Sequence, residues 1–317
     1  MFHAALIVAF LFSVVPVCRG GEGRVRLHGS AVIGKGSWLL AVQDVAAMPD
    51  GGLLVSDKLD YRVKKFAADG KQVAAVGGRG RGPGQFLGPG PIDCSEKRIA
   101  VADFASNRIQ CFTCDFVYLR TLRVEGAVSD LCFDGSGRLW VVAVTLDAKR
   151  TLFQFDDDGA TRKTLRLQNA RGDLFADAGF VSWLGGGRLA VSYFVQNKIE
   201  IWDTSGVLRR EFSVPGLPAM SPVRKLGDAG DGMQVPEGNI FRGMSSNKSG
   251  VLCLLVGDYG EYPERELIMM NEEGQVMQRL LLPDTVVQIT GVDSVIYAVT
   301  RDRNSVRRYA VPGVTKR

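Results

Sequence analysis

Few side chains in this chain could do acid–base or metal chemistry. The best candidates are five oxygen-bearing residues, each near the start of a predicted inner strand: Asp44, Asp130, Asp177, Glu237 and Asn239. Carboxylate and amide oxygens are the ligands that Ca²⁺ prefers in proteins. The five residues therefore predict a calcium site. The alternative is that acids at such positions only cap turns and order the chain ahead of a strand.

Histidine chemistry is largely excluded. The only histidines are His3 and His28, and we expect His3 to be removed with an N-terminal leader. A zinc centre built from several histidines cannot then form. A Ser-His-Asp hydrolase would have to use His28 as its base, and no G-x-S-x-G sequence supplies the nucleophile. We therefore predict no catalytic residue and no cofactor other than calcium.

Five cysteines remain if Cys18 leaves with the leader, so at least one is unpaired or pairs with another chain. Cys111 and Cys114 have C-x-x-C spacing, but we place Cys111 in a strand and Cys114 in the hairpin after it, where no helix N-terminus lowers the thiol pKa. Cys132 alone does not complete a zinc site. We expect inert structural cysteines. The alternatives are thiol chemistry or a disulfide between two members of a group of four: Cys94, Cys111, Cys114 and Cys132.

The elements that hold these residues come from a recurring strand–turn–strand pattern. Residues 53–66 (LLVSDKLDYRVKKF) and 99–112 (IAVADFASNRIQCF) each place an aspartate five positions before an arginine and nine before a phenylalanine. Weaker copies bring the total to six units; they lie at residues 139–155, 193–202, 252–270 and 300–309. A unit of about four short strands cannot bury both faces of its own sheet, but radial stacking against neighbouring units can. The repeat length therefore predicts an all-β fold, a six-bladed β-propeller.

Ring closure is expected to involve the N-terminus. The last unit, residues 286–311, contains only three predicted strands. Residues 24–28 alternate polar with apolar side chains, which is typical of a half-buried strand. We therefore expect this N-terminal strand to supply the missing fourth strand and close the propeller, so that residues 21–317 form one domain.

The unit resembles the NHL repeat of six-bladed, NHL-type (TolB-like) propellers. Residues 82–86 (GPGQF) closely match the glycine-rich start of that repeat, and residues 101–112 closely match its V-A-D-x-x-N-x-R-I-x-x-F strand pair, with Asn107-Arg108-Ile109 at the name-giving position. The resemblance extends over nearly the whole mature chain and is strongest in the first two units. It implies the fold and hardly constrains the function. Through lactonase-like propellers it also implies the alternative function, a calcium-dependent hydrolase with acids at the channel mouth.

Two short motifs have structural interpretations. Residues 77–82 are rich in glycine, but they lead into a strand rather than a helix N-terminus, so we interpret them as a crossover between units and not as a phosphate loop. Residues 156–159 (DDDG) lack the remaining ligands of a calcium loop and are interpreted as a hairpin turn.

The first twenty residues are interpreted as a signal peptide. Residues 4–17 form an apolar run too short to span a bilayer comfortably, and Cys18-Arg19-Gly20 suits cleavage after Gly20. A lipid anchor on Cys18 is the alternative. We therefore expect a secreted or periplasmic protein with no transmembrane span after signal removal.

One segment departs from the repeat. Residues 215–239 contain four prolines and five glycines and show no periodicity. Loops of this length in compact domains are generally functional or disordered. We therefore expect a long loop on one face, where Arg224, Lys225 and Met233 offer mixed polar and apolar contacts to a partner. A passive loop is the alternative.

These features favour a binding module or scaffold over an enzyme. The expected partner is a protein or another extracytoplasmic ligand. Nucleic acid is not expected, because the net charge of +5 is mild and the arginines do not form a basic stripe.

Overall fold

The computed structural model describes residues 24–27, 31–33, 39–145, 147, 149–167, 178–226, 233–291 and 294–311. Within these ranges every regular element is a β-strand, and no helix is long and apolar enough to cross a membrane. The predicted leader, His28 and Asp177 lie outside the described residues.

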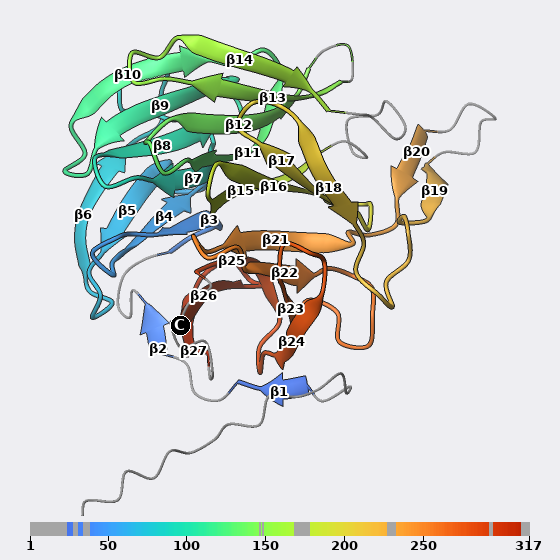
Figure 1. The fold of residues 1–317 in the computed structure, drawn as a ribbon. Helices are drawn as coiled ribbons and strands as arrows, with labels where there is room; N and C mark the ends of the chain where they lie inside the picture. Colours follow the sequence, from blue (N-terminus) through green and yellow to red (C-terminus); the bar gives the residue numbers. More distant parts are fainter. Residues whose placement is uncertain are drawn as a thin grey trace, which may run out of the picture.

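Six sheets are arranged around a central axis as the blades of a propeller (Figure 1). Blades one and two contain β3 (Val42–Ala47), β4 (Leu53–Asp57), β5 (Arg62–Phe66) and β6 (Gln72–Gly77), then β7 (Pro89–Cys94), β8 (Arg98–Asp103), β9 (Arg108–Thr113) and β10 (Tyr118–Arg123). Blades three and four contain β11 (Ala127–Phe133), β12 (Leu139–Val144), β13 (Arg150–Phe155) and β14 (Thr161–Arg166), then β15 (Gly179–Gly185), β16 (Arg188–Tyr193), β17 (Ile199–Asp203) and β18 (Leu208–Phe212). Blades five and six contain β21 (Phe241–Ser246), β22 (Leu252–Val256), β23 (Glu266–Met270) and β24 (Val276–Leu281), then β25 (Val286–Thr290), β26 (Val295–Thr300) and β27 (Val306–Ala310). The prediction of a six-bladed, all-β propeller is confirmed.

The first strand of each blade lies next to the channel, and each contacts the first strand of the next blade until β25 returns to β3. Successive strands of a blade run in opposite directions. The crossovers between blades and the connections between second and third strands therefore lie on one face, which we call the crossover face. The remaining turns lie on the opposite face.

The hydrophobic core is divided into six clusters, one between each pair of neighbouring blades. β8 shows how one strand serves two of them. Its side chains alternate between the two faces of the sheet, so that Ile99 and Val101 pack against blade one while Ala100 and Ala102 pack against blade three. No blade has a core of its own, and each depends on both neighbours.

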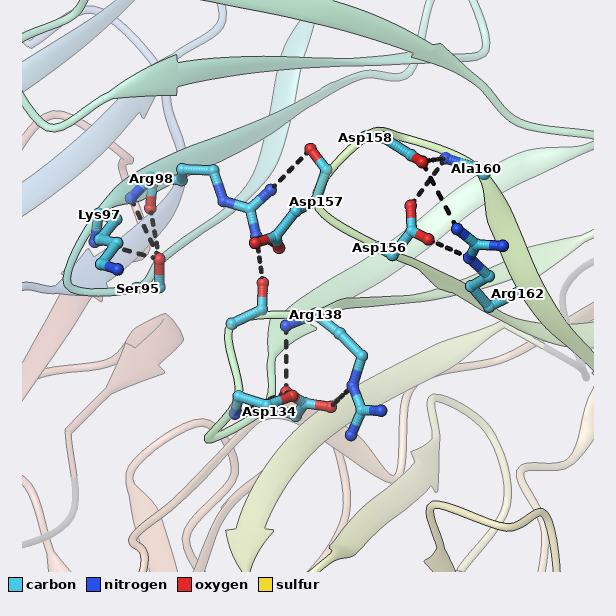
Figure 2. Close-up of polar contacts among 12 residues, drawn as sticks. Ser95, Lys97, Arg98, Asp134, Arg138, Asp156, Asp157, Asp158, Ala160 and Arg162 are labelled. Atoms are coloured by element: carbon cyan, nitrogen blue, oxygen red, sulfur yellow. Dashed lines mark hydrogen bonds and ion pairs between the residues drawn. The ribbon is translucent and has the colours of Figure 1, made fainter.

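Polar contacts reinforce the blade boundaries on the opposite face. Arg98 of blade two donates to the carbonyl oxygen of Gly137 and to the carboxylate of Asp157, both in turns of blade three (Figure 2). Residues 156–159 form the predicted hairpin turn, where the Gly159 N–H donates to the Asp156 carbonyl. Arg188 of blade four and Glu272 of blade five make an equivalent ion pair.

The N-terminus closes the ring differently from our expectation. Residues 24–26 form β1, which pairs in parallel with β24 and makes a fifth strand of blade five. The fourth strand of blade six is instead β2 (Ala31–Ile33), antiparallel to β27. Alternation of polar and apolar side chains predicts a strand, but it does not predict which other strand it pairs with. Arg24 stabilises this pairing, because its guanidinium makes ion pairs with Glu261 and Glu266 of blade five.

Closure by β2 can be tested with two neighbouring side chains. Ile33 is 3% exposed and packs between blades six and one, whereas Val32 is 37% exposed. We expect Ile33→Ala to lower the free energy of unfolding by about 2–5 kcal/mol, because it leaves a cavity in that cluster. The matched Val32→Ala should change it by no more than about 0.5 kcal/mol. Urea unfolding of both variants checks this, and equal effects would show that β2 does not close the core.

Candidate functional site

A cavity of about 190 Å³ opens where the channel meets the crossover face. Its walls include residues of all six inner strands, among them Gln43, Ser129 and Val287. Phe194 and Arg303 reach it from connections between second and third strands, and Asn239 reaches it from the crossover into blade five. The cavity therefore combines a rigid strand floor with a rim of loop residues.

Polar hydrogen bonds run around the channel from blade to blade. Three aspartates on successive inner strands each accept a hydrogen bond from a backbone N–H of the next blade: Asp44 from Ile92 (2.9 Å), Asp93 from Phe133 (2.7 Å) and Asp130 from Val181 (2.9 Å). Serines make the links from blade four to five and from five to six: Ser182 with Ser246 (2.6 Å), and the Gly291 N–H with Ser245 (3.1 Å). The Gln288 amide donates to Asp44 at 2.6 Å and joins blade six to blade one. We call this set the inner ring.

The inner-ring carboxyls have unusual acidities. Burial raises the pKa of Asp44 to about 6 and that of Asp93 to about 7, although backbone N–H donors act in the opposite direction. Burial and the nearby Asp44 raise the pKa of Asp130 well above its ordinary range. Near neutral pH this region therefore carries less negative charge than its three acids suggest.

The structure brings together three of the five predicted calcium ligands. Asp44, Asp130 and Asn239 line the cavity. Glu237 is exposed and is not among the lining residues, and Asp177 lies outside the described part of the chain. Within that part, no group of three or more His, Cys, Asp or Glu side chains is arranged to hold a metal ion. Asp44 and Asp130 do order the chain between blades, and the calcium site stays a prediction.

The long segment before blade five is not the aperiodic loop that we expected. It contains an antiparallel hairpin of β19 (Val223–Leu226) and β20 (Met233–Pro236). Arg224 and Lys225 lie on β19, where the Arg224 side chain is exposed, and Met233 begins β20. Because the segment is rich in glycine and proline, the sequence did not predict two strands of only four residues each. We call residues 213–240 the excursion.

The base of the excursion is fastened to the ring. The Asn197 side chain accepts from the Val214 N–H and donates to the carbonyls of Val214 and Leu217. The Ser221 hydroxyl contacts the Tyr259 hydroxyl of blade five at 2.7 Å. The hairpin therefore rises from a fixed base on the crossover face, the face that carries the cavity.

Several cavity residues were not identified from sequence. Arg303 and Phe194 lie in turns whose composition is unremarkable, and Gln288 lies in the last unit, where nothing in the sequence distinguishes it. The backbone of Arg303 has a φ of 57°, in the left-handed region that non-glycine residues rarely adopt. Residue type alone carries no signal for that conformation, so the sequence offered no way to predict where this guanidinium points.

The five cysteines of the described chain are free. Cys111 lies in β9 and Cys114 in the turn after it, as expected. Burial raises the pKa of Cys111 to about 11 and that of Cys253 to about 12, which suppresses the reactive thiolate. No disulfide forms among the four cysteines considered for one.

Comparisons with known proteins support the fold. Residues 38–162 match a family model described as a 6-bladed beta-propeller, which spans blades one and two and most of blade three. A search of curated proteins finds no match. Many solved structures are similar in fold.

Three of them illustrate the range. Virginiamycin B lyase from Staphylococcus aureus has a TM-score of 0.57 at 13% identity, covering 86% of this chain and 95% of the lyase. Hydrazine synthase from Kuenenia stuttgartiensis has a TM-score of 0.59 at 11% identity, covering 87% and 97%. U3-55K has a TM-score of 0.58 at 14% identity, covering 86% and 98%. At such low identities the likeness concerns architecture alone, and this chain is a six-bladed β-propeller.

The inner ring predicts an unusual pH dependence of stability. A carboxyl whose pKa is raised by folding contributes stability that is present below its unfolded pKa, near 4, and is lost as the pH rises through the folded value. Asp57, Asp134 and Asp203 have lowered pKa values and do not titrate between pH 5 and 8. We therefore expect a larger free energy of unfolding at pH 5 than at pH 8, by about 1.4 kcal/mol for each pH unit over which one raised carboxyl ionises.

Urea unfolding at the two pH values measures this difference. Asp93→Asn should reduce this pH difference in the free energy of unfolding, because the amide cannot ionise. The control variant Asp157→Asn, at an exposed position, should leave the difference unchanged. A wild-type protein that is equally stable at pH 5 and pH 8 would contradict the assignment.

Proposed function

We propose that this chain is an exported propeller of the NHL type that acts as a binding module. Its partner is a protein or another extracytoplasmic ligand, recognised on the crossover face. The observation that carries the proposal is the excursion, because it adds a hairpin to that face without contributing a strand to any blade.

The hairpin has the properties of a recognition arm. Among the described residues, no backbone hydrogen bond joins β19 or β20 to the ring. Figure 1 shows the two strands standing away from the blades beside β18 and β21. A short hairpin with a fixed base can present side chains to a partner at little entropic cost, because the rigid scaffold positions it.

Hydrogen bonds in blades one and two support the NHL type. Asp103 accepts from the N–H groups of Leu87 and Gly88 in the preceding crossover, and Asp57 accepts in the same way from Leu40 and Ala41. The Gln110 side chain accepts from the Gly84 N–H and donates to the Gln85 carbonyl. The motif residues therefore have a shared role, which is to fasten each crossover to its blade.

Excision of the hairpin tests the recognition face. We expect replacement of residues 223–236 by a short Gly-Ser linker to leave thermal melting nearly unchanged, because loop closure costs only about 0.6 kcal/mol per doubling of length. Capture of the partner by the tagged mature protein from an extract of its own organism should fall sharply. Val117→Ser, at an exposed position on the rim of blade two, is the control for surface substitution. Unaltered capture by the excised protein would place recognition elsewhere.

Export is tested separately. We expect the mature chain to begin near Gly21 and to fractionate outside the cytoplasm, because the apolar run ends in a suitable cleavage sequence. Mass spectrometry of the purified native protein identifies its first residue. An intact N-terminus on folded cytoplasmic protein would overturn the proposal of export.

A further inference from the structure

One cation in the cavity stands out because it donates to backbone carbonyls rather than to a carboxylate. The Arg303 guanidinium is half-buried and donates to the backbone carbonyls of Val42 (2.9 Å) and Gln43 (3.5 Å). Within the described part of the chain it forms no ion pair with a carboxylate. Burial and the neighbouring Arg242 lower its pKa, so the site disfavours this positive charge, and the neighbouring Asp44 offsets only part of that effect. An anion in the cavity would relieve that cost.

The other cation of the cavity is already compensated. Arg242 pairs with Asp258 (2.9 Å) and with Glu264 (2.7 Å), and Glu264 also pairs with Arg301. The charges of these two arginines and two acids sum to zero. Arg303 is therefore the cation of the cavity whose N–H groups can donate to a bound anion, and the positive charge of Arg242 nearby favours an anion at the same place.

One part of the wall is suited to a flat apolar group. Phe180 and Phe194 lie with ring centroids 4.7 Å apart, and the buried Phe241 lines the same cavity. A dry cavity of about 150 Å³ is large enough for benzene. The present cavity of about 190 Å³ therefore has room for one aromatic ring and a carboxylate.

We propose that the cavity binds a small organic carboxylate that carries an aromatic ring, with its carboxylate at Arg303 and its ring against Phe180 and Phe194. This inference deepens the proposed function, since it rests on the crossover face as the binding face, but it concerns the cavity and not the hairpin. The free acid and the C-terminus of a peptide ending in Phe share this chemistry.

Calorimetry with benzoate tests the proposal on the wild-type protein. Benzoate should bind at least tenfold more tightly than benzamide, which lacks the charge, and than acetate, which lacks the ring. Benzoate binding no better than benzamide, or tighter binding of benzylamine, would overturn the inference. A tripeptide ending in Phe, compared with its C-terminal amide, assigns the source: a preference for the tripeptide acid over benzoate indicates a chain terminus, and the reverse indicates a free acid.

Two variants locate the site. Arg303→Gln should weaken benzoate at least tenfold, whereas Arg301→Gln, on the same loop but 66% exposed, should not. Thermal melting checks folding, and the wild-type preference for benzoate over benzamide stands even if a variant fails to fold.

The hairpin-excised protein separates this inference from the proposed function. Loss of partner capture with benzoate binding intact supports both, and intact capture with intact benzoate binding overturns only the recognition role of the hairpin. Absence of benzoate binding in the wild type overturns only the carboxylate site.

Discussion

The structure depends on one constraint, which is that every blade shares its core with two neighbours. The alternating side chains of a strand such as β8 enter two different clusters, and the six clusters form an unbroken circle. A sheet of four short strands cannot be stable alone. Because the six clusters between blades hold the ring together, the loops outside them can differ in length and sequence. The excursion can therefore be added between blades four and five without changing the ring.

The sequence predicted this architecture because the packing constraint leaves a periodic trace. Asp57 and Asp103 recur at fixed offsets from an arginine and a phenylalanine, since each aspartate fastens a crossover and each phenylalanine, Phe66 or Phe112, fills a cluster between blades. The weaker copies in blades three and five were also placed on the correct strands. Local pattern and global fold agree in these units.

The missed features depend on contacts between distant residues. β2 has three residues and acquires its identity only from pairing with β27, some 270 residues further along the chain. The direction of Arg303 follows from a left-handed backbone, and the inner ring follows from which N–H groups the next blade presents to Asp44, Asp93 and Asp130. Sequence reasoning selected two of those aspartates as possible metal ligands. It could not show that much of their hydrogen-bonding capacity is occupied within the protein.

The closure by β2 also has a consequence for the order of assembly. Ribosomes make β2 before any blade, yet its partner β27 belongs to the last blade made. Domains tend to fold from the N-terminus during synthesis, and contacts between distant segments form slowly. The ring can therefore close only after the last blade has been synthesised. Until then the chain is an open arc of blades, and the apolar faces at its two ends are exposed to association with other nascent chains.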